Sequence, residues 1–158
     1  MVPKRVTQIL VESEAGIVDS WAKRNGWTVN IDLNRLEIAA EVPHPKDNSP
    51  LFLHGELSGY RAIPPAWRFV DESGNVTKAA FPAPGPVVNG KSSIFHGNVV
   101  ICAPFNRLAY QVAGGPHGDW GEWTGWFVVT GDFAKAYTLA EMLSIINVHL
   151  KFSPGRMQ

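Results

Sequence analysis

Apolar residues recur at helical spacing through residues 4–25 of the chain, and charged residues fill the positions between them. This pattern predicts an amphipathic helix with one face turned to a core. The predicted helix ends at Asn25-Gly26, because glycine readily takes the left-handed conformation that closes a helix. The apolar positions are Val6, Ile9, Leu10, Ile17, Val18 and Trp21.

Four short stretches after this helix alternate apolar and polar residues or form compact apolar runs, at 27–33, 36–42, 51–57 and 66–70. Alternation with a period of two is typical of half-buried strands. The connection at 43–50 is rich in proline and other turn formers. We therefore expect a four-stranded antiparallel meander behind the N-terminal helix.

The second half of the chain is irregular until its last element. Three prolines within five residues make 79–90 unsuited to regular structure, because proline removes backbone donors and fixes φ. We expect a loop that crosses the sheet there. Residues 92–102 then read as a short extended segment, and 111–126 as a loop rich in Gly and Trp.

A capping box, Thr138-x-x-Glu141, opens a final helix that runs to about Lys151. Its apolar face is made by Leu139, Met142, Leu143, Ile146 and Leu150. The order of elements predicts an α+β fold with an N-terminal helix, a four-stranded antiparallel meander, an irregular active-site region and a C-terminal helix. We expect residues 1–158 to form a single domain.

Composition narrows the function classes. The chain has 45% hydrophobic residues and 18% charged residues, and its 14 basic and 14 acidic side chains give no net charge. A balanced charge argues against nucleic-acid binding, and no apolar run is long enough to suggest a membrane span. One cysteine makes no internal disulfide, and no apolar signal segment follows the first residues, so we expect a cytoplasmic protein.

That one cysteine, Cys102, follows a strand-like apolar run and precedes a proline and a polar, Gly-rich segment. A lone cysteine is often a small buried hydrophobic residue. The end of a strand next to a loop is, however, a place where reactive groups are exposed. Both interpretations of Cys102 are open on this evidence.

Two motifs resemble the ubiquitin-conjugating enzyme family. The segment after the expected third strand resembles the family's proline-rich motif. It has the sequence Tyr60-Arg-Ala-Ile-Pro-Pro-Ala-Trp-Arg-Phe69, with Arg61 in place of the family's first proline. The tetrapeptide around Cys102, Val-Ile-Cys-Ala, is similar to the sequence around the family's catalytic cysteine. The two motifs also occur in the same order as in the family and at a similar separation. The resemblance implies that Cys102 carries a ubiquitin-like protein as a thioester.

The chain departs from the family at one motif. The family has a His-Pro-Asn tripeptide whose Asn lies eight residues before the cysteine, whereas this chain has Ile94 there. His96-Gly-Asn98 is similar to the tripeptide but lies closer to Cys102. Divergent bacterial members, associated with anti-phage defence operons, lack the tripeptide, and some place a histidine after the cysteine. His117 suits that description, so the chain looks more like the bacterial branch.

The resemblance implies a transferase mechanism. Cys102 would accept a ubiquitin-like protein from an activating enzyme and pass it to a lysine amine on an acceptor protein. Asn98 or a backbone N–H would stabilise the oxyanion. His117 or Asp119 would assist the amine as a base or by positioning it.

Lys4 and Arg5 lie on the first helix, which in the family helps to engage the activating enzyme, so they are candidate partner-binding residues. Neither a cofactor nor a metal is expected, because ATP is consumed by the activating enzyme. A second hypothesis is a catalytically inactive relative that binds ubiquitin-like or other proteins. A third is a carbohydrate- or peptide-binding module that uses Trp120, Trp123 and Trp126, although such residues more often cover a core.

Overall fold

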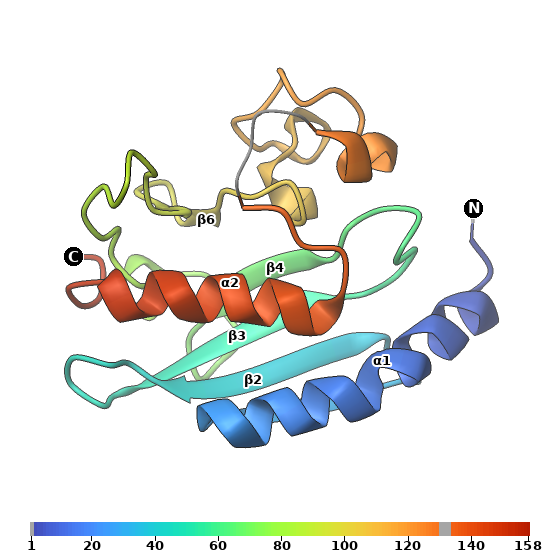
Figure 1. Cartoon of the computed structure of the whole chain (residues 1–158), viewed down its shortest axis with the longest axis horizontal. Helices are drawn as coiled ribbons and strands as arrows, with labels where there is room; N and C mark the ends of the chain where they lie inside the picture. The colour runs from blue at the N-terminus through green and yellow to red at the C-terminus, as the bar shows by residue number, and fades with distance from the viewer. Residues whose placement is uncertain (1, 130–133) are drawn as a thin grey trace.

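The computed structural model describes residues 2–129 and 134–158 and confirms the predicted α+β architecture (Figure 1). A long helix is followed by a four-stranded sheet, an irregular region and a second helix. The bounds are α1 Lys4–Asn25, β1 Thr28–Asp32, β2 Glu37–Pro43, β3 Pro50–Glu56, β4 Ala66–Val70 and α2 Leu139–Phe152. Each predicted strand lies within two residues of an observed one.

The sheet is the predicted meander. Its strand order is β1-β2-β3-β4, and each strand runs antiparallel to the next. Side chains alternate between the two faces, so Ile38, Ala40 and Val42 are buried while the β2 residues between them are exposed. Across the strands, Ala40 pairs with Leu53 and Leu53 with Phe69, which builds one apolar row on the core side.

Both helices begin or end as their sequences predict. Gly26 closes α1 with a φ of 72°, a conformation that costs glycine little. At the start of α2, the Thr138 hydroxyl accepts a hydrogen bond from the Glu141 N–H and donates one to the Glu141 carboxylate. The first contact satisfies a backbone donor that the first helical turn leaves without a partner, and the second fixes the Glu141 carboxylate beside the cap.

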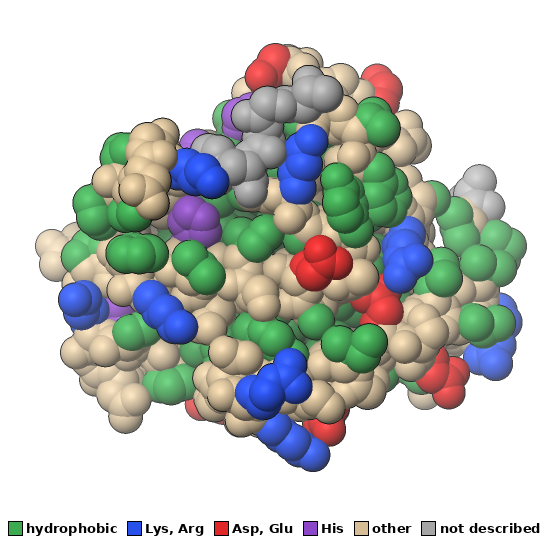
Figure 2. All heavy atoms as spheres, in the orientation of Figure 1, with side chains coloured by type: hydrophobic (Ala, Val, Ile, Leu, Met, Phe, Trp, Pro, Cys, Tyr) green, Lys and Arg blue, Asp and Glu red, His purple; other side chains and the backbone are tan. Residues whose placement is uncertain are grey.

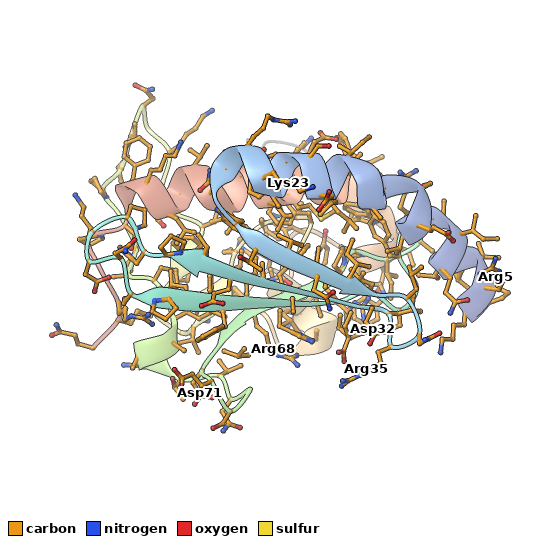
Figure 3. All side chains as sticks on the ribbon, turned by 90° about the horizontal axis from the view of Figure 1, so that it is seen from below. Arg5, Lys23, Asp32, Arg35, Arg68 and Asp71 are labelled. Carbon is orange, nitrogen blue, oxygen red and sulfur yellow. The ribbon has the colours of Figure 1, made fainter. Side chains whose placement is uncertain are left out.

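The two helices lie side by side over one face of the sheet, as the view in Figure 3 shows. The indole N–H of Trp21 in α1 donates to the Ser144 hydroxyl of α2 at 2.7 Å. Trp27, just before β1, donates to Asn147 of α2 at 3.3 Å. Arg68 and Asp71 point away from the helices on the other side of the sheet. The main core therefore lies between the sheet and the helix pair.

A buried carboxylate joins the ends of several elements. Glu14 of α1 accepts hydrogen bonds from the Tyr60 hydroxyl (2.8 Å), the Arg61 guanidinium (3.1 Å) and the backbone N–H of Leu139 (2.7 Å). Burial, together with the negative charge of Glu14, raises the pKa of Tyr60. Because Tyr60 and Arg61 open the proline-rich motif, this part of the motif is a structural corner between α1 and α2.

The region between β4 and α2 contains a small hairpin, which is more ordered than the single extended segment expected over 92–102. Strands β5 (Phe95–His96) and β6 (Val100–Ile101) pair antiparallel. Phe95 packs edge-on against Phe69 and Phe81, with ring centroids 5.7 Å and 6.3 Å away. This aromatic cluster fixes the hairpin onto the sheet.

Short 3₁₀ turns make up much of the remaining irregular region. They are η1 Lys78–Ala80, η2 Arg107–Ala109, η3 Gln111–Ala113 and η4 Trp123–Val128. The segment expected to be a Gly- and Trp-rich loop thus contains η3 and η4. Trp126 is buried, and its indole N–H donates to the backbone carbonyl of Arg61 at 2.9 Å. Neither α1 nor α2 is long and apolar enough to cross a bilayer, and the same holds for every other helix in the described part of the chain.

Candidate active site

Cys102 is the first residue after β6. Its backbone N–H donates to the Ile94 carbonyl at 2.6 Å, which keeps the residue in line with the hairpin. The side chain is 8% exposed, and Ala103 and Phe105 just beyond it are fully buried. Ala103 and Phe105 hold the backbone beside Cys102 in place. Because Cys102 itself is mostly buried, a reagent reaches its sulfur only through the small part of the residue that is exposed.

Asn106 fastens this segment to the sheet. Its carboxamide donates to the carbonyls of Ile101 (2.8 Å) and Trp67 (3.1 Å) and accepts a hydrogen bond from the Trp67 N–H (2.8 Å). The side chain is fully buried, so each of these bonds matters for stability. The carbonyl just before Cys102 is thereby tied to strand β4.

Arg107 joins the cysteine segment to the proline-rich motif. Its backbone N–H donates to the Pro65 carbonyl and its Nε to the Pro64 carbonyl, both at 2.9 Å. Its guanidinium also forms an ion pair with Glu56 at 2.7 Å. Asn106 and Arg107 therefore link the two motifs singled out in the sequence.

His117 reaches Cys102 because the chain turns back after η3. The His117 N–H donates to the Ala109 carbonyl at 3.0 Å, and His117 lies in a parallel bridge beside Tyr110. Gly115 makes this turn possible, since a side chain there would collide with the backbone of Leu108 and Ala109. The Gly-rich sequence thus brings a histidine fifteen residues further along the chain back to the cysteine.

Cys102, His117 and Asp119 form a continuous line of contacts. The Cys102 Sγ and the His117 Nε2 are 2.5 Å apart, and the His117 Nδ1 and the Asp119 Oδ1 are 3.1 Å apart. An ionised carboxylate only accepts hydrogen bonds, so Nδ1 carries a proton and Nε2 faces the sulfur. This is the arrangement of nucleophile, base and orienting carboxylate found in cysteine acyl transfer.

Trp120 holds the His117 ring from its face. The two rings are stacked, with centroids 3.7 Å apart and planes at 1° to each other. Tyr110 in turn meets Trp120 edge-on at 5.4 Å. The His117 side chain is 27% exposed and that of Asp119 is 77% exposed. The His117 ring is therefore held on its face by a stacked indole and on its edge by an exposed carboxylate.

A pocket of about 180 Å³ opens onto the cysteine. Residues from three segments of the irregular region form its walls. Its lining comprises Ser92, Ser93, Ile94, His96, Cys102, His117, Trp120 and Ala134. Histidine side chains are visible on the part of the surface above α2 in Figure 2. The pocket is large enough for a small acyl or amine group but not for a folded chain.

The predicted site residues divide into those that meet and those that do not. Cys102, His117 and Asp119 come together. Asn98 is exposed in the turn between β5 and β6 and does not line the pocket. Lys4 and Arg5 are exposed at the start of α1, and Arg5 is labelled at that end of the helix in Figure 3.

Three residues of the site were not assigned roles there by sequence. His96 lines the pocket, Asn106 fixes the segment around Cys102, and Trp120 stacks on His117. The available signals were a histidine six positions before the cysteine and a tryptophan three positions after His117. In the described residues, no group of three or more His, Cys, Asp or Glu side chains is arranged to hold a metal ion.

Comparisons with known proteins add no identification. No protein-family model matches the chain, and neither the curated proteins nor the solved structures contain a match to it. The contacts of Cys102 and the chemistry of its neighbours therefore carry the functional argument.

Proposed function

We propose that the protein is an acyl-transfer enzyme that carries a ubiquitin-like protein as a thioester on Cys102 and transfers it to an amine. The contact between the Cys102 sulfur and the His117 Nε2, with Asp119 behind the ring, is the observation that carries this proposal. The resemblance of the two motifs to ubiquitin-conjugating enzymes supplies the class of acyl donor.

In the loading step, His117 takes the thiol proton and the Cys102 thiolate attacks the thioester carbonyl of the donor. A new carbon–sulfur bond forms, and the donor's own carbon–sulfur bond breaks. The departing thiolate receives the proton from His117. Asp119 keeps the imidazole in the tautomer that this exchange needs.

In the transfer step, an amine nitrogen attacks the carbonyl of the Cys102 thioester. The nitrogen–carbon bond forms, the carbon–sulfur bond breaks with its electrons on Cys102 beside His117, and the proton lost by the amine nitrogen passes to a base and then to water. The backbone N–H of Cys102 and the carboxamide of Asn106 already have hydrogen-bond partners. We therefore assign the oxyanion to neither of them.

The proposed partners are a ubiquitin-activating enzyme, a ubiquitin-like protein and an acceptor protein, in a cytoplasmic setting. Lys4 and Arg5, exposed on α1, are the proposed contact with the activating enzyme. Asn98 is left out of the proposed mechanism because it does not line the pocket.

A small thioester tests the proposal without knowledge of the natural partner. The protein is mixed with N-acetyl-Gly-Gly benzyl thioester, and its intact mass is followed. We expect one acyl group on Cys102 that hydroxylamine removes, and none on the Cys102→Ala variant. In the presence of n-butylamine, the acyl group should leave as the butylamide.

The alternative is a catalytically inactive binding module with a buried structural cysteine. The low exposure of Cys102 favours it. It predicts no acylation of the folded protein and the same partner binding in Cys102→Ala. A protein that stays unacylated under conditions in which glutathione is acylated would overturn the enzyme proposal in favour of this module.

A further inference from the structure

A second histidine shares the pocket with Cys102. His96 is the last residue of β5 and pairs with Val100 of β6, two residues before the cysteine. The preceding residue, Phe95, is fully buried in the aromatic cluster, so alternation along the strand turns His96 to the opposite face. On that face it lines the Cys102 pocket together with His117.

The Ser93 backbone lies close enough to the His96 ring to act on its pKa. Ser93 is held in a tight turn, because its hydroxyl accepts a hydrogen bond from the Phe95 N–H at 3.1 Å. A neutral imidazole carries a proton on one ring nitrogen and leaves the other nitrogen as an acceptor.

Burial of the ring lowers the pKa of His96, and nearby His117, when protonated, lowers it further, while the Ser93 backbone acts in the opposite direction. The neutral form is therefore favoured near neutral pH. A neutral imidazole is able to take a proton, whereas the Nε2 of His117 is already engaged with the sulfur.

We propose that His96 is the catalytic base for the incoming amine, while His117 serves the Cys102 thiol. This inference rests on the proposed acyl-transfer function. The amine attacks the thioester carbonyl, the nitrogen–carbon bond forms, and the carbon–sulfur bond breaks with its electrons on Cys102. The proton lost from the amine nitrogen goes to the acceptor nitrogen of His96, which later releases it to water.

Separating loading from transfer tests the assignment. Each protein is first acylated with N-acetyl-Gly-Gly benzyl thioester, freed of reagent, and then given n-butylamine. For His96→Ala we expect loading within about twofold of the parent and transfer slower by about 100-fold, the usual contribution of a general base. Added imidazole should restore part of the lost rate. His117→Ala should slow loading instead.

His149→Ala is the matched control, because His149 packs edge-on against Phe95 but does not line this pocket. It should leave transfer unchanged. His96→Gln removes the base but keeps a polar side chain of similar size, so it guards against a folding defect and should be as slow as His96→Ala.

The outcomes are distinct. Normal transfer by both His96 variants would overturn the inference and leave the proposed function standing. An equal loss of loading and transfer, without rescue by imidazole, would also overturn it by assigning His96 a structural role. Failure of the parent protein to become acylated would instead remove the proposed function, and the inference with it.

Discussion

Two regions of the molecule are held together in different ways. One is the sheet β1–β4 with helices α1 and α2, which we call the scaffold, and the other is the irregular region around Cys102, which we call the reactive region. In the scaffold, two long helices cover a sheet of four paired strands, and the contact is broad and apolar. The reactive region has two strands of two residues each and several 3₁₀ turns. A few specific bonds hold it, among them those of Asn106 to Trp67 in β4 and of Arg107 to Glu56 in β3.

The difference predicts that stability and reactivity are separable in this chain. Removing a buried ring from the scaffold affects every element that packs against it. Removing a group from the line of Cys102, His117 and Asp119 leaves that packing intact. Substitutions in the two regions should therefore give opposite pairs of results in unfolding and acylation measurements.

Phe69→Ala should have the largest effect on stability. The ring is fully buried and meets both Phe81 and Phe95 edge-on, so its loss leaves a cavity between the sheet and the hairpin. We expect the free energy of unfolding in urea to fall by about 3–5 kcal/mol. A loss under about 1 kcal/mol would mean that the two regions do not share this core.

Asn106→Ala should affect both regions. It removes four hydrogen bonds and leaves buried carbonyls at Ile101 and Trp67 with fewer partners. We expect a loss of about 2 kcal/mol in urea unfolding, together with slower acylation of Cys102. Acylation at the parent rate in a destabilised variant would show that Asn106 does not position the cysteine.

The same contrast explains which elements could be predicted from the sequence and which could not. The helical period over 4–25 and the capping box at Thr138 are local signals, and the structure has helices at both places. The β5–β6 hairpin is too short to show a period. Its position depends on Phe95 reaching Phe69, a contact between residues far apart in the chain.

The candidate site was likewise predicted only where the sequence carries a local signal. The motif around Cys102 and a histidine beyond it pointed to residues that do meet. His96-Gly-Asn98 was interpreted by its likeness to a tripeptide, but the turn exposes Asn98, while the strand carries His96 into the pocket. Which side chain of a hairpin faces a pocket depends on strand register, which a short sequence does not specify.

Asp119→Ala should act on reactivity alone. Its carboxylate is 77% exposed, so its pair with His117 adds little to stability, and unfolding in urea should change by less than about 0.5 kcal/mol. Without it, His117 loses the partner that selects its tautomer. We expect acylation of Cys102 to slow by about tenfold, equivalent to about 1.4 kcal/mol. An unchanged acylation rate would mean that Asp119 does not orient the His117 ring and that Trp120 is sufficient to do so.

Mild acid should have a smaller effect, and it should act on the whole fold. Burial lowers the pKa of His44, His96 and His149. The unfolded chain therefore binds more protons between these lowered values and the ordinary value of about 6.5, so stability declines as pH falls through that window. We expect the free energy of unfolding to be lower at about pH 5.5 than at about pH 7.5.

His44→Gln should flatten this pH dependence. The Nδ1 of the fully buried His44 accepts a hydrogen bond from the Lys46 N–H at 3.0 Å, and a protonated ring would lose that bond. Equal free energies of unfolding for the parent at the two pH values would contradict the neutral state of these buried rings.

The most direct test of the account is the alkylation of Cys102 by iodoacetamide in the folded protein, with His117→Ala as the comparison. The assay needs no partner protein. If His117 activates the sulfur, the parent should be alkylated without unfolding, and His117→Ala should react at least about tenfold more slowly at neutral pH. A cysteine that reacts only after urea unfolding, at the same rate in both proteins, would contradict the account and make Cys102 a structural residue.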